Sequence, residues 1–340
     1  MNETVTAMLP VIDIAPLAER TNPDQERVVA ARIDHACSNF GFFYATGHGI
    51  DLKLLLDLRD ASAAFFALPE AIKAEIAMAK GGTAWRGWFP VRGELTSGLP
   101  DNKEGLYLGE ELGFEDPRVR AGLPLHGANL WPDAVPELRQ AVVDYLTSAV
   151  RAADAIMRGC ALALGLKADH FAKGLTAQPT LLFRLFHYPA PDAETVQSAP
   201  YGVGEHSDYG LLTLLAQDDK GGLEIRTRDG WIAVPPLADT LVINIGDMFE
   251  RLTKGRFRSA PHRVVNRAGV SRYSFPLFFD PDFQAEVQPL PELAPSSFPR
   301  ETRWDGLDIH EPIGTYGDYL IGKVSKVFPE LAQARLRNRA

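Results

Sequence analysis

Three residues of this chain have the types and the spacing of a metal site. His206 and Asp208 are separated by one residue, so their side chains share one face of a strand, and His262 follows roughly fifty residues later. Two imidazoles and one carboxylate make up the facial triad, which holds non-haem Fe(II) and leaves positions open for oxygen and a co-substrate. The alternative is that all three are satisfied polar residues at the ends of strands.

Two more polar side chains follow on the next apolar run. Arg272 and Ser274 also lie two residues apart and would point to one face of a strand. A planar guanidinium beside a hydroxyl suits a carboxylate, so we expect this pair to bind the far carboxylate of 2-oxoglutarate. Tyr188 is expected to add a hydroxyl hydrogen bond. The alternatives are an internal ion pair for Arg272 and an ordinary barrel aromatic for Tyr188.

The elements that must position these residues are predicted from hydrophobic periodicity. From residue 180 onward, short apolar runs alternate with turn signals such as Asp229-Gly230, which is typical of a sandwich or jelly roll. The stretch 80–135 is rich in Gly and Pro but carries large aromatics, and we expect mostly ordered loops there. Spacing of 3.6 residues predicts helices over the following ranges: 26–40, 52–66, 69–79, 136–165 and 316–331.

Composition limits the class of protein. The 340 residues are 46% hydrophobic and 23% charged, which is ordinary for a soluble globular protein. A net charge of -9 argues against a nucleic-acid binder, and no apolar run is long enough to span a membrane. The two cysteines, Cys37 and Cys160, fall in apolar helical patterns, so neither a disulfide framework nor a cysteine zinc site is expected. A reduced cytoplasm is the simplest location.

Seven short motifs, in this order, give the chain a family resemblance. They are Leu9-Pro10-Val11-Ile12-Asp13, Gly41-Phe42-Phe43-Tyr44, Gly47-His48-Gly49, His206-Ser207-Asp208-Tyr209-Gly210, Asn244-Ile245-Gly246-Asp247-Met248, His262-Arg263-Val264 and Arg272-Tyr273-Ser274. With them the chain resembles the iron(II)/2-oxoglutarate-dependent dioxygenases of the isopenicillin N synthase-like group over nearly its whole length. It departs from many plant members, which have Asn-Tyr-Tyr-Pro in place of Phe186-His187-Tyr188-Pro189.

The resemblance implies an α+β fold with a distorted double-stranded β-helix, a cupin-like jelly roll, surrounded by helices. On this basis we expect four parts: an N-terminal helix and loop region (9–135), a long scaffold helix with a short one (136–175), the β-helix core (180–282), and a Pro-rich segment with a final helix that packs on the core (283–340). The resemblance assigns His206, Asp208 and His262 to iron. It assigns Arg272 and Ser274 to 2-oxoglutarate.

The resemblance also implies the reaction. We expect a small-molecule substrate to be oxidised with O2, most often by hydroxylation, with release of succinate and carbon dioxide. The alternatives are an oxidase of the isopenicillin N synthase type that uses no 2-oxoglutarate, and a relative of the ethylene-forming and arginine-oxidising enzymes. A jelly roll with a structural metal is disfavoured, because structural zinc takes four protein ligands and three candidates are visible. The oligomeric state stays open.

The substrate contacts are less sharply defined by the sequence. We expect substrate-facing groups from the N-terminal loops, from the strand of Arg184, from Tyr209 beside the iron ligand, and from the last helix. Glu104 is a candidate for a cationic amine or guanidinium, against the alternative of a solvated loop charge. Arg86 and Arg184 are candidates for a substrate carboxylate, against the alternative of internal ion pairs.

Overall fold

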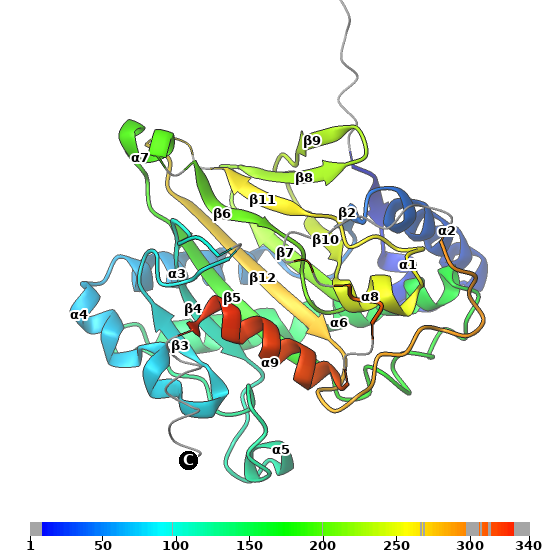
Figure 1. The fold of residues 1–340 in the computed structure, drawn as a ribbon, viewed down its shortest axis with the longest axis horizontal. Coiled ribbons are helices and arrows are strands. Elements are labelled where there is room, and N and C mark those ends of the chain that lie inside the picture. Colours follow the sequence, from blue (N-terminus) through cyan, green and yellow to red (C-terminus); the bar gives the residue numbers. More distant parts are fainter. Residues whose placement is uncertain are drawn as a thin grey trace, which may run out of the picture.

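Two β-sheets face each other at the centre of the molecule (Figure 1). The computed structural model describes residues 9–96, 98–198, 200–265, 267, 269–296, 306, 308–311 and 314–329. The eight-stranded sheet has the order β1 (Val11–Asp13), β2 (Phe42–Thr46), β10 (Leu241–Ile245), β7 (Leu212–Gln217), β12 (Arg272–Asp280), β5 (Thr180–Tyr188), β4 (Glu104–Gly109) and β3 (Gly87–Phe89). The four-stranded sheet has the order β6 (Tyr201–His206), β11 (His262–Val265), β8 (Leu223–Thr227) and β9 (Gly230–Ala233).

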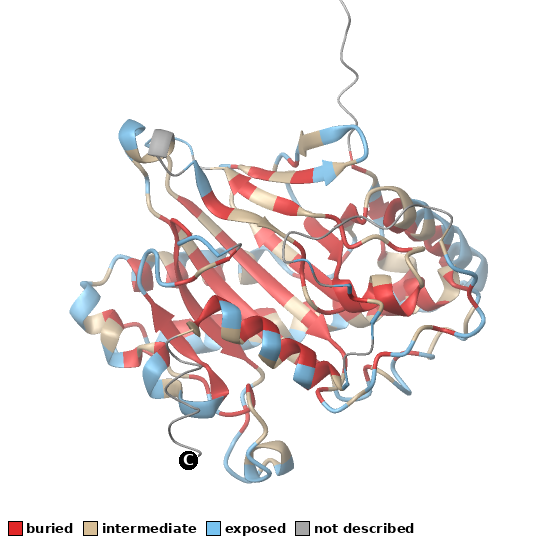
Figure 2. Ribbon diagram, viewed as in Figure 1, coloured by how far each residue is buried: buried red, intermediate tan, exposed pale blue. Residues whose placement is uncertain are grey.

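The predicted jelly roll is confirmed. Almost every strand pair is antiparallel, and strands distant in sequence are neighbours, as β12 is of both β5 and β7. The central strands are buried along nearly their whole length (Figure 2). Apolar side chains of the two sheets therefore form the core, and polar side chains can gather at the mouth of the barrel.

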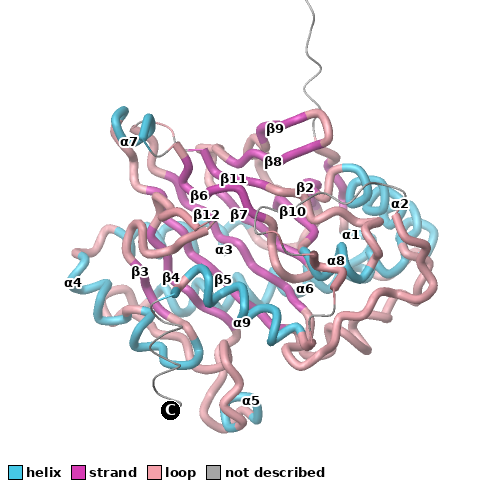
Figure 3. Tube along the Cα trace, in the orientation of Figure 1, coloured by secondary structure: helices cyan, strands magenta, loops and turns pink. Residues whose placement is uncertain are grey.

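Helices cover the outer face of the larger sheet (Figure 3). The long helix α6 (Glu137–Ala163) packs on β12 and β7, and the helices α1 (Ala15–Glu19), α2 (Pro23–Asn39) and α3 (Leu52–Phe66) pack on α6. The buried residues of α6 recur at helical spacing, which explains why the sequence predicts this helix well. The helix ends before Gly165, whose φ of 76° lies in the left-handed region that glycine favours.

The segment that follows α3 differs from the prediction of one helix over 69–79. The structure has a short helix α4 (Glu70–Lys73) and two 3₁₀ segments, η1 (Ala74–Ile76) and η2 (Met78–Ala84). Within η2 the backbone at Gly82 is not helical, with φ 53° and ψ -133°. The periodicity therefore identified helical turns without showing that the chain bends between them.

The stretch 80–135 contains more regular structure than expected. Strands β3 and β4 extend the larger sheet beyond β5, and a short helix, α5 (Pro117–Arg120), follows. All six residues of β4 are buried, so the strand shows no alternation of apolar and polar residues by which it could be recognised. Most of the stretch is loop, as expected, but the two strands were not predicted.

The last described helix lies over the mouth of the barrel. This helix, α9 (Tyr316–Val327), begins with a capping box in which Thr315 and Asp318 bond each other's backbone N–H. The predicted helix extended to 331, but residues 330–340 lie outside the described part of the chain. Two short helices, α7 (Ala193–Ser198) and α8 (Asp247–Leu252), complete the structure. Among the described residues no helix is long and apolar enough to cross a bilayer.

Candidate active site

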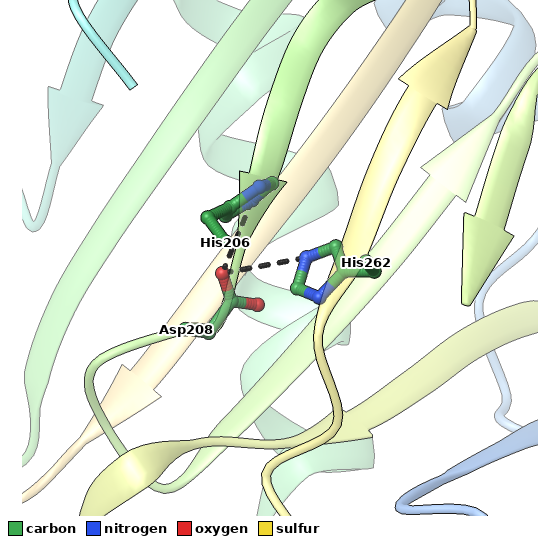
Figure 4. Close-up of side chains that lie close together, drawn as sticks. All are labelled: His206, Asp208 and His262. Carbon is green, nitrogen blue, oxygen red and sulfur yellow. Dashed lines mark ion pairs between the residues drawn. The ribbon is translucent and has the colours of Figure 1, made fainter. Parts of the chain in front are cut away.

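The three residues of the predicted triad meet at the mouth of the barrel (Figure 4). His206 ends β6, Asp208 follows in the next loop, and His262 begins the neighbouring strand β11, where it is paired with His206. The Asp208 Oδ1 atom lies 3.8 Å from His206 Nε2 and 3.7 Å from His262 Nε2. One ligand atom from each residue lies within 4.8 Å of the other two, which is close enough for one ion.

Backbone carbonyls orient both imidazoles. The Nδ1 atom of His206 lies 2.8 Å from the carbonyl of Gly204, and that of His262 lies 3.2 Å from the carbonyl of Ala260. These contacts favour a proton on Nδ1 in each ring and leave the Nε2 lone pair for a metal. Burial lowers the pKa of His206, and burial together with His206 lowers the pKa of His262 to about 4. Both shifts favour the neutral imidazole, which is the form in which histidine binds a metal.

Two neighbouring side chains hold Asp208. Its Oδ2 atom accepts hydrogen bonds from Thr213 Oγ1 at 2.5 Å and from Asn244 Nδ2 at 2.7 Å, so Oδ1 faces the imidazoles. Burial opposes ionisation of Asp208, but His262, His206 and these two donors together lower its pKa below the ordinary value. The carboxylate is thus ionised and fixed in direction.

The predicted carboxylate clamp lies on the opposite sheet. Arg272 is 4% exposed and Ser274 is 2% exposed, and both line the same cavity as the triad. Arg272 donates to Gln217 Oε1 at 3.3 Å, and its guanidinium lies 4.7 Å from the centre of the Tyr188 ring. Its buried Nε and Nη1 atoms have no hydrogen-bond partner in the described structure. Buried donors of this kind fit an incoming carboxylate.

The four predicted substrate residues separate into two pairs. Arg184 and Tyr209 line the cavity. Arg86 does not, because its guanidinium donates to the carbonyls of Leu108 at 2.8 Å and Leu125 at 2.9 Å. These contacts make Arg86 structural, although its partners are carbonyls and not the acidic side chains of the expected ion pair.

Glu104 also lies away from the cavity lining, in the buried strand β4. Its carboxylate accepts from Lys73 Nζ at 2.7 Å and Trp88 Nε1 at 2.9 Å, and lies 2.8 Å from His187 Nδ1. Glu104 is therefore neither a solvated loop charge nor placed to meet a substrate cation.

The cavity also has lining residues to which no individual role was assigned from the sequence. The side chains of Glu94 and Lys103 face the cavity, and α9 contributes an apolar wall. The wall consists of Leu320, Val324, Val327 and, just after the helix, Phe328. The charged pair lies in a Gly- and Pro-rich stretch without periodicity. The last helix was expected to contribute substrate-facing groups, and α9 lines the cavity. Asn244 belongs to a motif that the sequence showed, but its bond to Asp208 needed the structure.

Comparison with known proteins agrees with this geometry. Residues 9–134 match the N-terminal family of non-haem dioxygenases in morphine synthesis, and residues 179–281 match the 2OG-Fe(II) oxygenase superfamily. A probable iron/ascorbate oxidoreductase of Dictyostelium discoideum is 42% identical over 95% of each chain. A homoarginine-6-hydroxylase of Glycine max is 34% identical over 95% of this chain and 98% of its own.

Among solved structures, a full-length protein of Neurospora crassa in complex with alpha-KG and 5-formyluracil aligns with a TM-score of 0.76 and 26% identity. The alignment covers 96% of this chain and 98% of that one.

A jelly roll with a two-histidine, one-carboxylate cluster at its mouth defines the class of non-haem iron oxygenases. The chain belongs to the 2OG-Fe(II) oxygenase superfamily. It is an Fe(II)- and 2-oxoglutarate-dependent dioxygenase that oxidises a small molecule.

Proposed function

We propose that His206, Asp208 and His262 bind the iron of this dioxygenase, and that Arg272, Ser274 and Tyr188 bind the far carboxylate of 2-oxoglutarate. Two features of one cavity together carry the proposal. Three ligand atoms lie within 4.8 Å of one another, and on the facing sheet the Arg272 Nε and Nη1 atoms have no hydrogen-bond partner among the described residues. Bound iron would supply oxygen activation, driven by conversion of 2-oxoglutarate to succinate and carbon dioxide.

The protein's own contribution is positioning. Thr213 and Asn244 keep Asp208 pointed at the imidazoles, and Gln217 keeps the Arg272 guanidinium directed into the cavity. Apolar residues of α9 exclude water from the same space. Arg184 and Tyr209 then face the substrate from the wall of the barrel, where Arg184 can hold a substrate carboxylate.

Two finer points are part of the proposal. We infer a small metabolite as substrate, supported by the cavity beside the triad and by a relative named for homoarginine and a neighbour solved with 5-formyluracil. We also infer a cytoplasmic location, supported by two buried cysteines that form no disulfide.

The test is an anaerobic titration of 2-oxoglutarate into the Fe(II)-loaded protein, followed by the visible metal-to-ligand charge-transfer band. We expect the band in the wild type. In Arg272→Ala we expect the affinity for 2-oxoglutarate to fall by roughly a hundredfold, because a charge-assisted bidentate contact is lost. The control is Arg59→Ala, which removes an exposed arginine on α3.

Three results would count against these assignments. Iron that binds without a band would favour the oxidase that uses no 2-oxoglutarate. Unchanged affinity in Arg272→Ala would remove the clamp. Tight iron binding by Asp208→Ala would remove the triad. Succinate formed in equal amount to oxidised substrate would exclude the oxidase.

A further inference from the structure

Three charged side chains are buried together where β4 meets the cavity. Glu94, Asp101 and Lys103 are 6%, 2% and 1% exposed, and the first and third line the cavity that also contains the triad. Charged side chains are seldom buried this completely unless they are paired. The way they pair determines what charge the cavity offers to a substrate.

Lys103 lies between the two carboxylates. Its Nζ atom is 2.8 Å from Glu94 Oε2 and donates a hydrogen bond to Asp101 Oδ2, and it lies 4.8 Å from the centre of the Phe186 ring. Burial would lower the pKa of Lys103, but Asp101 and Glu94 outweigh burial and raise it above the ordinary value. The ammonium group is therefore charged and paired with both carboxylates.

The carboxylates have further donors of their own. Glu94 Oε1 accepts a hydrogen bond from the Tyr107 hydroxyl, and Asp101 Oδ2 accepts one from Thr96 Oγ1 at 2.5 Å. Together with Lys103 these contacts occupy the acidic groups at this end of the cavity. Among the described residues, Glu94 Oε2 makes no hydrogen bond, but it forms its ion pair with Lys103, so a substrate cation would have to compete with Lys103 for it.

Unlike Lys103, Arg184 is not paired with a carboxylate among the described residues. Its guanidinium carbon lies 3.4 Å from the centre of the Tyr107 ring, and Nη1 donates to the carbonyls of Leu108 and Phe183. Asp280, another acidic residue of the cavity, is bonded to the Tyr316 hydroxyl and to the Leu211 N–H.

We propose that Lys103 takes the position of a cationic substrate group, so that this enzyme selects a small molecule with an anionic group, bound by Arg184, and no cation at this end. The inference rests on the proposed function, because it concerns the same cavity. The proposal predicts that this chain does not accept homoarginine, the guanidinium-bearing compound for which two relatives are named.

The physical reason is the cost of a second cation. A substrate cation beside Lys103 would meet a like charge, and displacing Lys103 would leave a buried ammonium without its partners. Either event weakens binding of a cationic substrate. An anionic substrate instead forms an ion pair with the buried guanidinium of Arg184.

The test uses two probes of equal length, hexanoate and n-hexylammonium, titrated by calorimetry into the anaerobic Fe(II) protein with 2-oxoglutarate bound. Bound 2-oxoglutarate keeps hexanoate away from Arg272. We expect the wild type to bind hexanoate and to give no heat with n-hexylammonium. Arg184→Gln should weaken hexanoate at least roughly tenfold, and Lys103→Ala should tighten n-hexylammonium at least roughly tenfold.

Lys73→Ala is the matched control, because Lys73 is an equally buried lysine that pairs with Glu104 outside the cavity lining. It should bind neither probe differently from the wild type. The proposal is overturned if the wild type binds n-hexylammonium as tightly as hexanoate, if it does not bind hexanoate, or if Arg184→Gln leaves hexanoate unchanged. These outcomes remain decisive even where Lys103→Ala does not fold. A missing charge-transfer band in the wild type would instead refute the proposed function.

Discussion

At the scale of single residues, the direction of Asp208 depends on two neutral donors. Thr213 and Asn244 both bond Oδ2, so removing either leaves the carboxylate freer to rotate away from the imidazoles. Such partners of ligands commonly contribute one to two orders of magnitude to metal affinity. The ligand residues alone therefore do not define the site.

Thr213→Val tests this dependence, since valine keeps the shape and removes the hydroxyl. We expect Fe(II) affinity to fall by roughly 10- to 100-fold, measured by anaerobic competition with a chromogenic chelator. Thr147→Val is the control, because the Thr147 hydroxyl bonds a helix carbonyl on the exposed side of α6. Equal affinities in wild type and Thr213→Val would show that Asn244 alone is sufficient.

Sequence spacing was a good guide to residues that act in the same strand. Arg272 and Ser274 were recognisable because a period of two places them on one face of β12. His206 and Asp208 were found by the same spacing, although β6 ends at His206 and Asp208 lies in the loop that follows. Gln217 was not recognisable, because only the tertiary fold brings β7 beside Arg272 of β12. Glu94 and Lys103 were not assigned roles because the stretch that carries them shows no periodicity. Arg86 and Glu104 were misassigned for the same reason: a buried charge in a Gly-rich stretch has the same sequence signature whether its partner is a ligand or the protein.

At the scale of elements, α9 is attached to the barrel through buried carboxylates. The Tyr316 hydroxyl donates to Asp280 at the end of β12, and the Tyr319 hydroxyl donates to Asp247 of α8 at 2.8 Å. Gly210 packs so closely on Asp280 that a Cβ atom there would lie 1.4 Å from Oδ1. The helix that forms the cavity wall is thus joined to β12 through the carboxyl group of Asp280.

Asp280→Asn should stabilise the protein above neutral pH. Burial raises the pKa of Asp280 from 3.8 to about 7, so the folded protein binds more protons than the unfolded chain between these values. The contribution of Asp280 to stability is therefore present at low pH and is lost as pH rises from about 4 to about 7. Asparagine cannot ionise, and we expect a gain of ~1 to 4 kcal/mol at pH 8, seen as a higher Tm.

The exposed turn residue Asp229, changed to Asn, serves as the control for the Asp280 experiment and should leave the pH profile of unfolding unchanged. A profile that stays the same in Asp280→Asn would mean that the carboxyl is hydrated in solution and does not titrate abnormally.

Strands showed the limits of pattern reading most clearly. The β5, β7 and β12 strands are long apolar runs and were predicted. The β6 strand was not, because Gly202 and Gly204 interrupt it, although it carries the first ligand of the triad. Antiparallel pairing with β11 stabilises β6 although its residues have a weak intrinsic preference for a strand.

At the scale of the whole molecule, the proposed metal ligands come from neighbouring strands of the smaller sheet and the loop that joins it to β7. Iron with 2-oxoglutarate should therefore stabilise the fold. At a free concentration one hundred times the Kd the gain is about 2.7 kcal/mol, measurable as a higher Tm under anaerobic conditions. Asp208→Ala should show no such gain; a gain equal to that of the wild type would place the metal elsewhere.

The two sheets also divide the proposed site between them. His206 and His262 belong to the four-stranded sheet, whereas Arg272 and Ser274 belong to the eight-stranded sheet that faces it. A keto acid held at both ends would span the gap, and packed sheets keep that gap nearly constant. The distance between the sheets would then select the co-substrate by its chain length. The five carbons of 2-oxoglutarate would reach from metal to guanidinium. Oxaloacetate would be one carbon too short, and 2-oxoadipate would have to bend in order to fit.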